Sequence, residues 1–83
     1  MPTTLKDLGV GQRGRIVRLT RRGELGQRLA AMGFNRGVLV EVRRIAPLGD
    51  PMEIRVLGYH LSLRKKEAEH VLVERLPASG GSV

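Results

Sequence analysis

The sequence lacks several residue types, and each absence excludes a class of protein. None of its 83 residues is cysteine, so disulfide bridges and thiolate zinc sites are excluded. Phe34 and Tyr59 are the only aromatic residues, too few for a platform that stacks nucleic-acid bases. No apolar run approaches the ~20 residues that span a bilayer, and the N-terminus has no signal-peptide pattern. We therefore expect one soluble, intracellular domain.

The residues that usually form catalytic or metal centres are also scarce. The only histidines are His60 and His70, and nothing in the spacing of the three serines indicates a catalytic triad. Glu67 and Glu69 beside His70 are candidate metal ligands, but a permanent site needs three or four converging ligands. A solvated charged turn explains the same residues. The sequence thus predicts no enzyme, no catalytic residue, no cofactor and no permanent metal site, and leaves weak binding of a divalent ion such as Fe²⁺ open.

Positive charge is abundant. Fifteen Lys and Arg residues against eight Asp and Glu give a formal net charge of +7. Such an excess attracts nucleic acid, acidic membrane surfaces or an acidic protein. The cations come in short groups, Arg21-Arg22, Arg43-Arg44 and Arg64-Lys65-Lys66, rather than in one long arm. The sequence leaves open whether they form a binding patch or a solvated surface.

One stretch has a clear helical pattern. In "RRGELGQRLAAMG", Leu25, Leu29 and Met32 fall at i, i+4 and i+7, so they share one helical face. Gly33 follows at the position where a helix end turns left-handed, and Phe34 should then pack back on Leu29. These residues are best explained as structural.

The remaining chain is typical of short strands joined by turns. Gly37 turns the chain into "VLVEVRRIA", whose alternation slips near Arg44 as a β-bulge would make it do. "MEIRV" and "YHLSL" alternate around Gly58, and "VLVERL" ends the pattern. We expect a mostly β fold of about five strands with one short helix, in a strongly bent sheet or small barrel over residues 1–76. Residues 77–83 are expected to be a disordered polar tail.

Taken together, these segments resemble the ferrous iron transport protein A (FeoA) family. The resemblance is carried by "LGVGQRGRIVRL", "RLAAMGFNRGVLVEV" and "APLGDPMEIRVLGYHLSLRKKEAEHVLVE". It implies an SH3-like β-barrel, with the helix from Glu24 to Met32 in the first long loop. It also implies a small cytosolic accessory of bacterial ferrous iron uptake, which acts with FeoB, a membrane iron transporter with a GTP-binding domain. The family is often labelled as metal-ion binding.

The resemblance makes a binding module the first hypothesis, with the chain peripheral to the membrane through its partner. The alternative is a nucleic-acid-binding or metal-responsive regulatory module, although the scattered charge and few aromatics lead us to expect no nucleic acid. The oligomeric state stays open. Candidate partner contacts lie on the polar side of the helix, in the loop that we expect to be rigid, and after the fifth strand: Gln27, Arg28, Pro47, Leu48, Gly49, Asp50, Pro51, Arg64 and Lys65.

Overall fold

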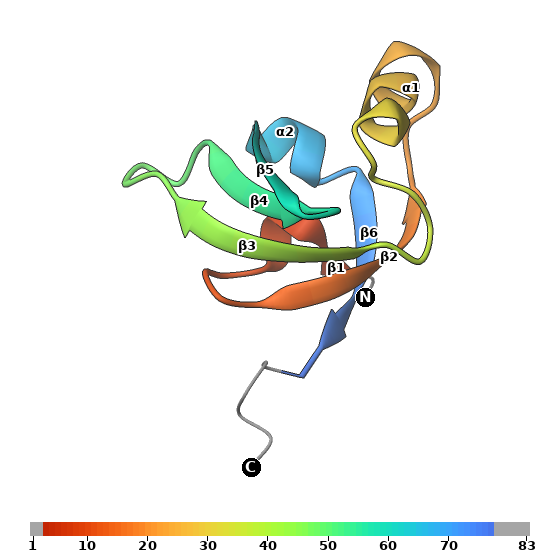
Figure 1. The fold of residues 1–83 in the computed structure, drawn as a ribbon. Coiled ribbons are helices and arrows are strands. Elements are labelled where there is room, and N and C mark those ends of the chain that lie inside the picture. The colour runs from red at the N-terminus through yellow and green to blue at the C-terminus, as the bar shows by residue number, and fades with distance from the viewer. Residues whose placement is uncertain (1–2, 78–83) are drawn as a thin grey trace.

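A computed structural model describes residues 3–77 as one six-stranded antiparallel sheet with a single well-formed helix (Figure 1). The strand order in the sheet is β1-β6-β2-β3-β4-β5. In chain order, the elements are β1 (Thr3–Thr4), the 3₁₀ turn η1 (Leu5–Asp7), β2 (Arg13–Leu19), α1 (Gly23–Ala31), β3 (Leu39–Ile45), β4 (Met52–Val56), β5 (Tyr59–Leu63), α2 (Lys65–Ala68) and β6 (Val71–Leu76).

The core lies inside the bent sheet, where the alternating apolar residues of the strands meet the inner face of α1. Val40, Val42, Met52, Ile54 and Val56 are fully or almost fully buried, as the alternation in their strands predicts. No polar or charged residue is buried among residues 3–77. The sheet therefore carries its charged side chains on its outer face.

The end of α1 confirms the prediction for Gly33 and Phe34. Gly33 has a φ of +101°, its N–H donates to the Ala30 carbonyl, and the Phe34 N–H donates to the Leu29 carbonyl at 3.0 Å. This pair of bonds is the Schellman motif, which satisfies the last carbonyls of a helix. Phe34 and Leu29 are both completely buried in the same core, so the motif joins the helix end to the sheet.

The hairpin of β4 and β5 approaches this helix end. Its two-residue turn consists of Leu57 and Gly58, with φ values of +52° and +85°, as a type I′ turn requires. The Tyr59 hydroxyl donates a hydrogen bond to the Met32 carbonyl at the C-cap of α1. A Cβ added at Gly33 would lie 2.6 Å from Leu57 Cδ1, so the turn sits directly on the helix end.

The expected fold class is confirmed, with two differences in detail. The sheet has six strands rather than about five, because Thr3 and Thr4 form a two-residue strand against β6. The sheet is also not closed, since β1 and β5 stand at its two ends. The expected bulge is present, as the register of β3 and β4 shifts between Val42 and Arg44. Apart from Pro77, the expected polar tail lies outside the described residues.

Candidate functional site

Four of the contact residues predicted from the sequence are linked at α2, namely Arg28, Asp50, Arg64 and Lys65. Arg28 of α1 forms an ion pair with Glu67 of α2, and the Glu67 carboxylate also accepts the Arg64 N–H at 2.9 Å. One carboxylate therefore holds α1 and the start of α2 together. We call the predicted set the α2 surface, which comprises Gln27, Arg28, Arg64, Lys65 and the loop 47–51.

The loop of the α2 surface is held in place by its acidic residue. The Asp50 carboxylate accepts the Lys65 N–H at 2.9 Å, and the Lys65 side chain lies against Gly49. Leu48 in this loop is 97% exposed. Pro47 and Pro51 of the loop also line a groove of about 300 Å³ together with Glu53.

The candidate metal ligands do not converge. The Glu67 carboxylate forms an ion pair with Arg28. The Glu69 carboxylate lies 3.7 Å from Lys6 Nζ and 3.7 Å from His70 Nε2. The other ring nitrogen of His70 is 3.1 Å from the Thr20 hydroxyl. His60 lies apart on β5, 3.6 Å from Glu53. Within residues 3–77 no three residues of the types His, Cys, Asp and Glu are grouped to hold a metal ion.

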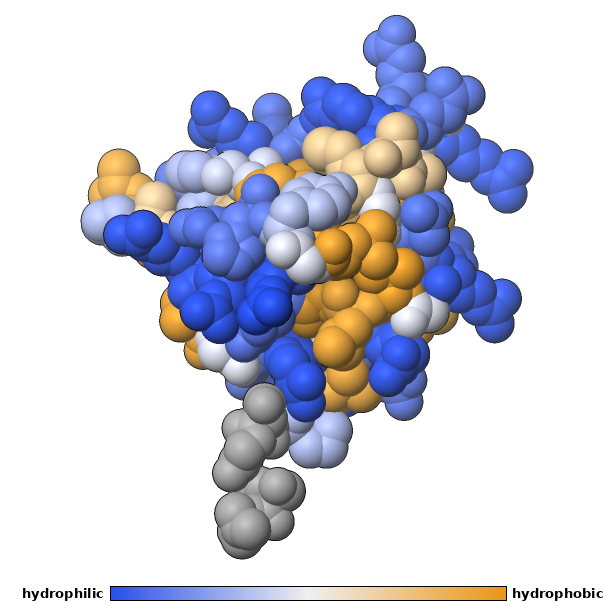
Figure 2. Space-filling view, in the orientation of Figure 1, coloured by the Kyte–Doolittle hydropathy of each residue, from blue (hydrophilic) through white to orange (hydrophobic). Residues whose placement is uncertain are grey.

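The sequence did not predict one pocket that the structure shows on the described residues. It has a volume of about 480 Å³ and lies on the outer face of the sheet. We call it the sheet pocket. Figure 2 shows an exposed apolar area, bordered by hydrophilic residues, over the start of β3 near the β4–β5 turn. The lining residues are Arg13, Val38, Leu39, Val40, Glu41, Arg55, Leu57 and Gly58.

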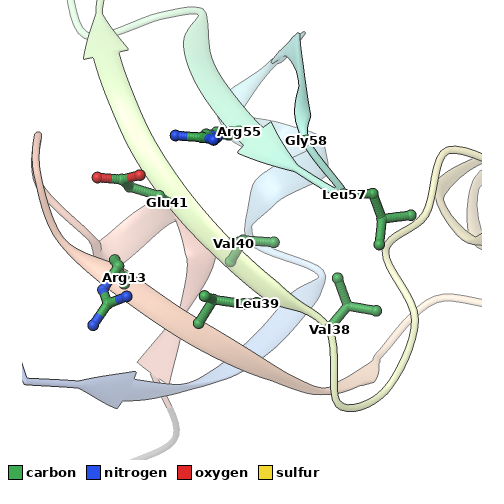
Figure 3. A pocket seen from close by; sticks show the side chains of 8 residues that line it. All are labelled: Arg13, Val38, Leu39, Val40, Glu41, Arg55, Leu57 and Gly58. Carbon is green, nitrogen blue, oxygen red and sulfur yellow. The ribbon is translucent and has the colours of Figure 1, made fainter. Parts of the chain in front are cut away.

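The sheet pocket has an apolar end and a charged end, as Figure 3 shows. Val38 and Leu57 lie at one end, and Arg13, Glu41 and Arg55 at the other. The strand register creates the charged end, since Glu41 of β3 pairs with Arg13 of β2 on one side and with Arg55 of β4 on the other. Two guanidinium groups and one carboxylate give this end a formal charge of +1.

The sequence alone could not predict the sheet pocket. The lining residues come from three strands and a turn, and the sequence does not give the register in which these strands pair. One local signal was available. A leucine directly before Gly58, between two alternating strands, occupies a turn position that prefers Asn, Asp or Gly.

The family model described as the FeoA domain matches residues 3–75, which is nearly all of the described chain. The chain belongs to the FeoA family. Its resemblance to this family, inferred from three sequence segments, is thereby confirmed.

Solved FeoA structures share its fold. A FeoA-like protein from Clostridium acetobutylicum is 31% identical and matches with a TM-score of 0.86, covering 94% of this chain and 91% of that one. FeoA from Stenotrophomonas maltophilia is 25% identical, with a TM-score of 0.78 over 87% of this chain and 89% of that one. That protein was solved in complex with zinc and is described as an SH3 domain protein and a candidate activating factor of bacterial ferrous iron transport.

A relative from Porphyromonas gingivalis joins two proteins in one chain. It is a fusion of Fe(2+) transport protein A with the Fe(2+) transporter FeoB, and it is 36% identical over 94% of the present chain. The FeoA chain described here spans only 9% of the length of that relative. Within residues 3–77, no helix has the length and apolar character that a membrane span requires.

Proposed function

We propose that this FeoA chain binds the cytosolic part of an FeoB-type ferrous iron transporter and modulates iron transport or GTP turnover. The fusion in Porphyromonas gingivalis supports the proposal most directly. Covalent joining gives two domains a high effective concentration for each other, which is useful where they act together. In this proposal the chain acts by binding at the inner face of the membrane, catalyses no reaction and needs no cofactor.

We propose that the cations of the α2 surface contact acidic residues of the transporter. Arg64, Lys65 and Lys66 are exposed consecutive cations, and none of the three forms an ion pair among residues 3–77. Arg28 is different, because its charge is already matched by Glu67. Cations at the rim of an interface mainly raise the association rate with an acidic partner. Arg64 and Lys65 are therefore the residues whose reversal should slow the encounter.

The direct test is a binding measurement between the purified chain and the detergent-solubilised FeoB-type transporter of the same cell. It is made at physiological salt, with and without a GTP analogue. Saturable binding supports the proposal, and dependence on the nucleotide assigns control to the GTP-binding domain. No binding to a preparation in which the transporter is active would refute it.

A pair of double variants tests the α2 surface within that measurement. Arg64→Glu with Lys65→Glu should lower the association rate and weaken its salt dependence. Arg21→Glu with Arg22→Glu changes the net charge by the same amount on exposed residues before α1, so it serves as the control. Equal effects of the two double variants would show that only net charge matters and that the α2 surface is not a contact.

A further inference from the structure

The geometry points to the sheet pocket as a docking site for an acidic segment of the transporter that carries a large apolar side chain. This inference rests on the proposed function and goes beyond it by naming a second surface and the chemistry of the segment that fits there. The segment would place its apolar side chain at the end formed by Val38 and Leu57, and a carboxylate on the guanidinium group of Arg55 or Arg13, to the side of Glu41.

The apolar end is exposed in a way that the fold does not require. Leu57 is 63% exposed although it occupies a left-handed backbone position, which is unfavourable for a residue with a Cβ. Asn at this position would relieve most of that strain. Leu57 contacts Gly33, but most of its side chain stays in water, so the contact explains little of the choice of leucine. Strained, exposed apolar residues of this kind are found where a surface binds a partner.

The charged end retains unused hydrogen-bonding capacity. Neither Arg13 nor Arg55 forms an ion pair among residues 3–77, because the Glu41 carboxylate is turned to Arg43 at 3.4 Å. The Arg13 Nε is buried and has no acceptor in the described part of the chain. The one side-chain hydrogen bond that Arg13 makes within residues 3–77, from Nη2 to the Pro77 carbonyl, is long at 3.5 Å. Guanidinium groups in this state bind carboxylates strongly, often through two parallel bonds.

Charge complementarity therefore decides the kind of occupant. A second copy of this chain would bring a strongly cationic surface, since the net charge is +7, to a pocket end that is itself positive. A wholly apolar ligand would leave the two arginines desolvated without an acceptor, which is costly. A protein segment with an apolar anchor and a nearby carboxylate satisfies both ends of the pocket.

Substitutions at the two ends test the inference in the binding assay with the detergent-solubilised transporter. Leu57→Asn keeps a residue that accepts the left-handed turn, so we expect unchanged or higher thermal stability and about tenfold weaker binding. Val10→Asn is the matched control, because Val10 is also a turn residue, is 61% exposed and does not line the pocket. This control should change binding less than twofold, on the order of an ordinary surface effect.

The charged end has its own pair of variants. Arg55→Glu should weaken binding and reduce its dependence on salt, whereas Arg18→Glu, an exposed β2 cation outside the pocket, should do so far less. The Arg55 and Arg18 variants do not alter the β4–β5 turn. They therefore still test the pocket if Leu57→Asn disturbs the fold. Thermal unfolding of each variant identifies any that is not folded.

The outcomes separate this inference from the proposed function. If the wild-type chain binds the transporter and both pocket variants bind equally well, the pocket inference is overturned while the proposed function stands. If the wild-type chain does not bind the active transporter, both are refuted. If Leu57→Asn instead dissolves a dimer seen by sedimentation and leaves transporter binding unchanged, the pocket belongs to a second copy and the inference is equally wrong.

Discussion

At the residue scale, Gly33 meets two separate requirements. Its φ of +101° lies in the region that a side chain disfavours, and a Cβ there would lie 2.6 Å from Leu57 Cδ1. We therefore expect Gly33→Ala to destabilise the fold by the ~1–2 kcal/mol of backbone strain, with only a small addition from displacing the exposed end of the Leu57 side chain. Urea unfolding of the variant measures the loss.

Gly37 supplies the control for this prediction. It has a similar φ of +87°, but a Cβ built on it meets no atom within 4 Å. Gly37→Ala should therefore show the backbone cost without the contact. If the two alanine variants lose the same free energy of unfolding, the contact between Gly33 and the β4–β5 turn contributes nothing.

Asp7 is the residue for which the structure indicates a pH-dependent contribution. Its carboxylate accepts the Thr4 N–H at 2.9 Å and the Thr4 hydroxyl at 3.2 Å, in a capping box at the start of η1. The backbone hydrogen bond from Thr4 holds the pKa of Asp7 below its ordinary value. A lowered folded-state pKa stabilises the fold above the unfolded-state pKa, and this stability is lost as the pH falls through the folded-state pKa.

The matching variant is Asp7→Asn, which cannot ionise. We expect the wild type to be more stable than the variant at neutral pH, and the difference to shrink as the pH falls below about 4, near the unfolded-state pKa of Asp. Chemical unfolding at a series of pH values measures both proteins. A stability difference that stays constant with pH would show that the ionised carboxylate has no part in the cap.

The sequence predicted the structural role of some of these residues and not of others. Gly33 and Phe34 were predicted correctly, since a helix end followed by glycine and an apolar residue is a local pattern with a local cause. Leu57 was not, because its importance depends on a turn conformation and on the neighbouring helix end. The difference is whether the forces that fix a residue come from adjacent residues or from distant ones.

At the element scale, Tyr59 ties the β4–β5 hairpin to α1. Its hydroxyl donates to the Met32 carbonyl, one of the last carbonyls of the helix end. Tyr59→Phe removes this bond and leaves the ring, so we expect a loss of about 0.5–1.5 kcal/mol. The loss should appear locally, as faster amide hydrogen exchange at Gly33 and Phe34, whose N–H groups bond within the same helix end.

Amides of β2 and β6 give the internal reference for this measurement. Those two strands pair over most of their length, and Tyr59 lies on neither of them. Their exchange should change little unless the whole molecule is destabilised. A uniform increase across all strands would mean that Tyr59 acts on global stability rather than as a link between hairpin and helix.

The elements themselves were largely predictable, but their arrangement was not. The helix was expected from Glu24 to Met32 and runs from Gly23 to Ala31, since apolar spacing and the terminal glycine mark its extent. The pairing of β1 with β6 joins residues 68 and 70 positions apart, and no local pattern in the sequence indicates it. The candidate site follows the same division. The α2 surface, which stays a prediction as a contact, could be named because its cations and loop are visible in the sequence, whereas the sheet pocket depends on register.

At the scale of the whole molecule, the two proposed contacts differ in their physical character. The α2 surface offers exposed cations, which act at long range and are screened by salt. The sheet pocket adds an apolar end, whose contribution depends on area removed from water and is much less sensitive to salt. A molecule with both can be steered to an acidic partner by charge and then held by the apolar contact.

A double-variant cycle tests whether the two surfaces contribute to one complex. Arg64→Glu with Lys65→Glu forms one arm and Leu57→Asn the other, with binding to the solubilised transporter as the measured quantity. If the surfaces meet separate parts of the transporter, the free-energy losses should add within about 0.5 kcal/mol. Raising the salt concentration should then remove the loss caused by charge reversal while leaving the loss at Leu57. A loss in only one of the two arms would show that only that surface is in contact when the complex forms.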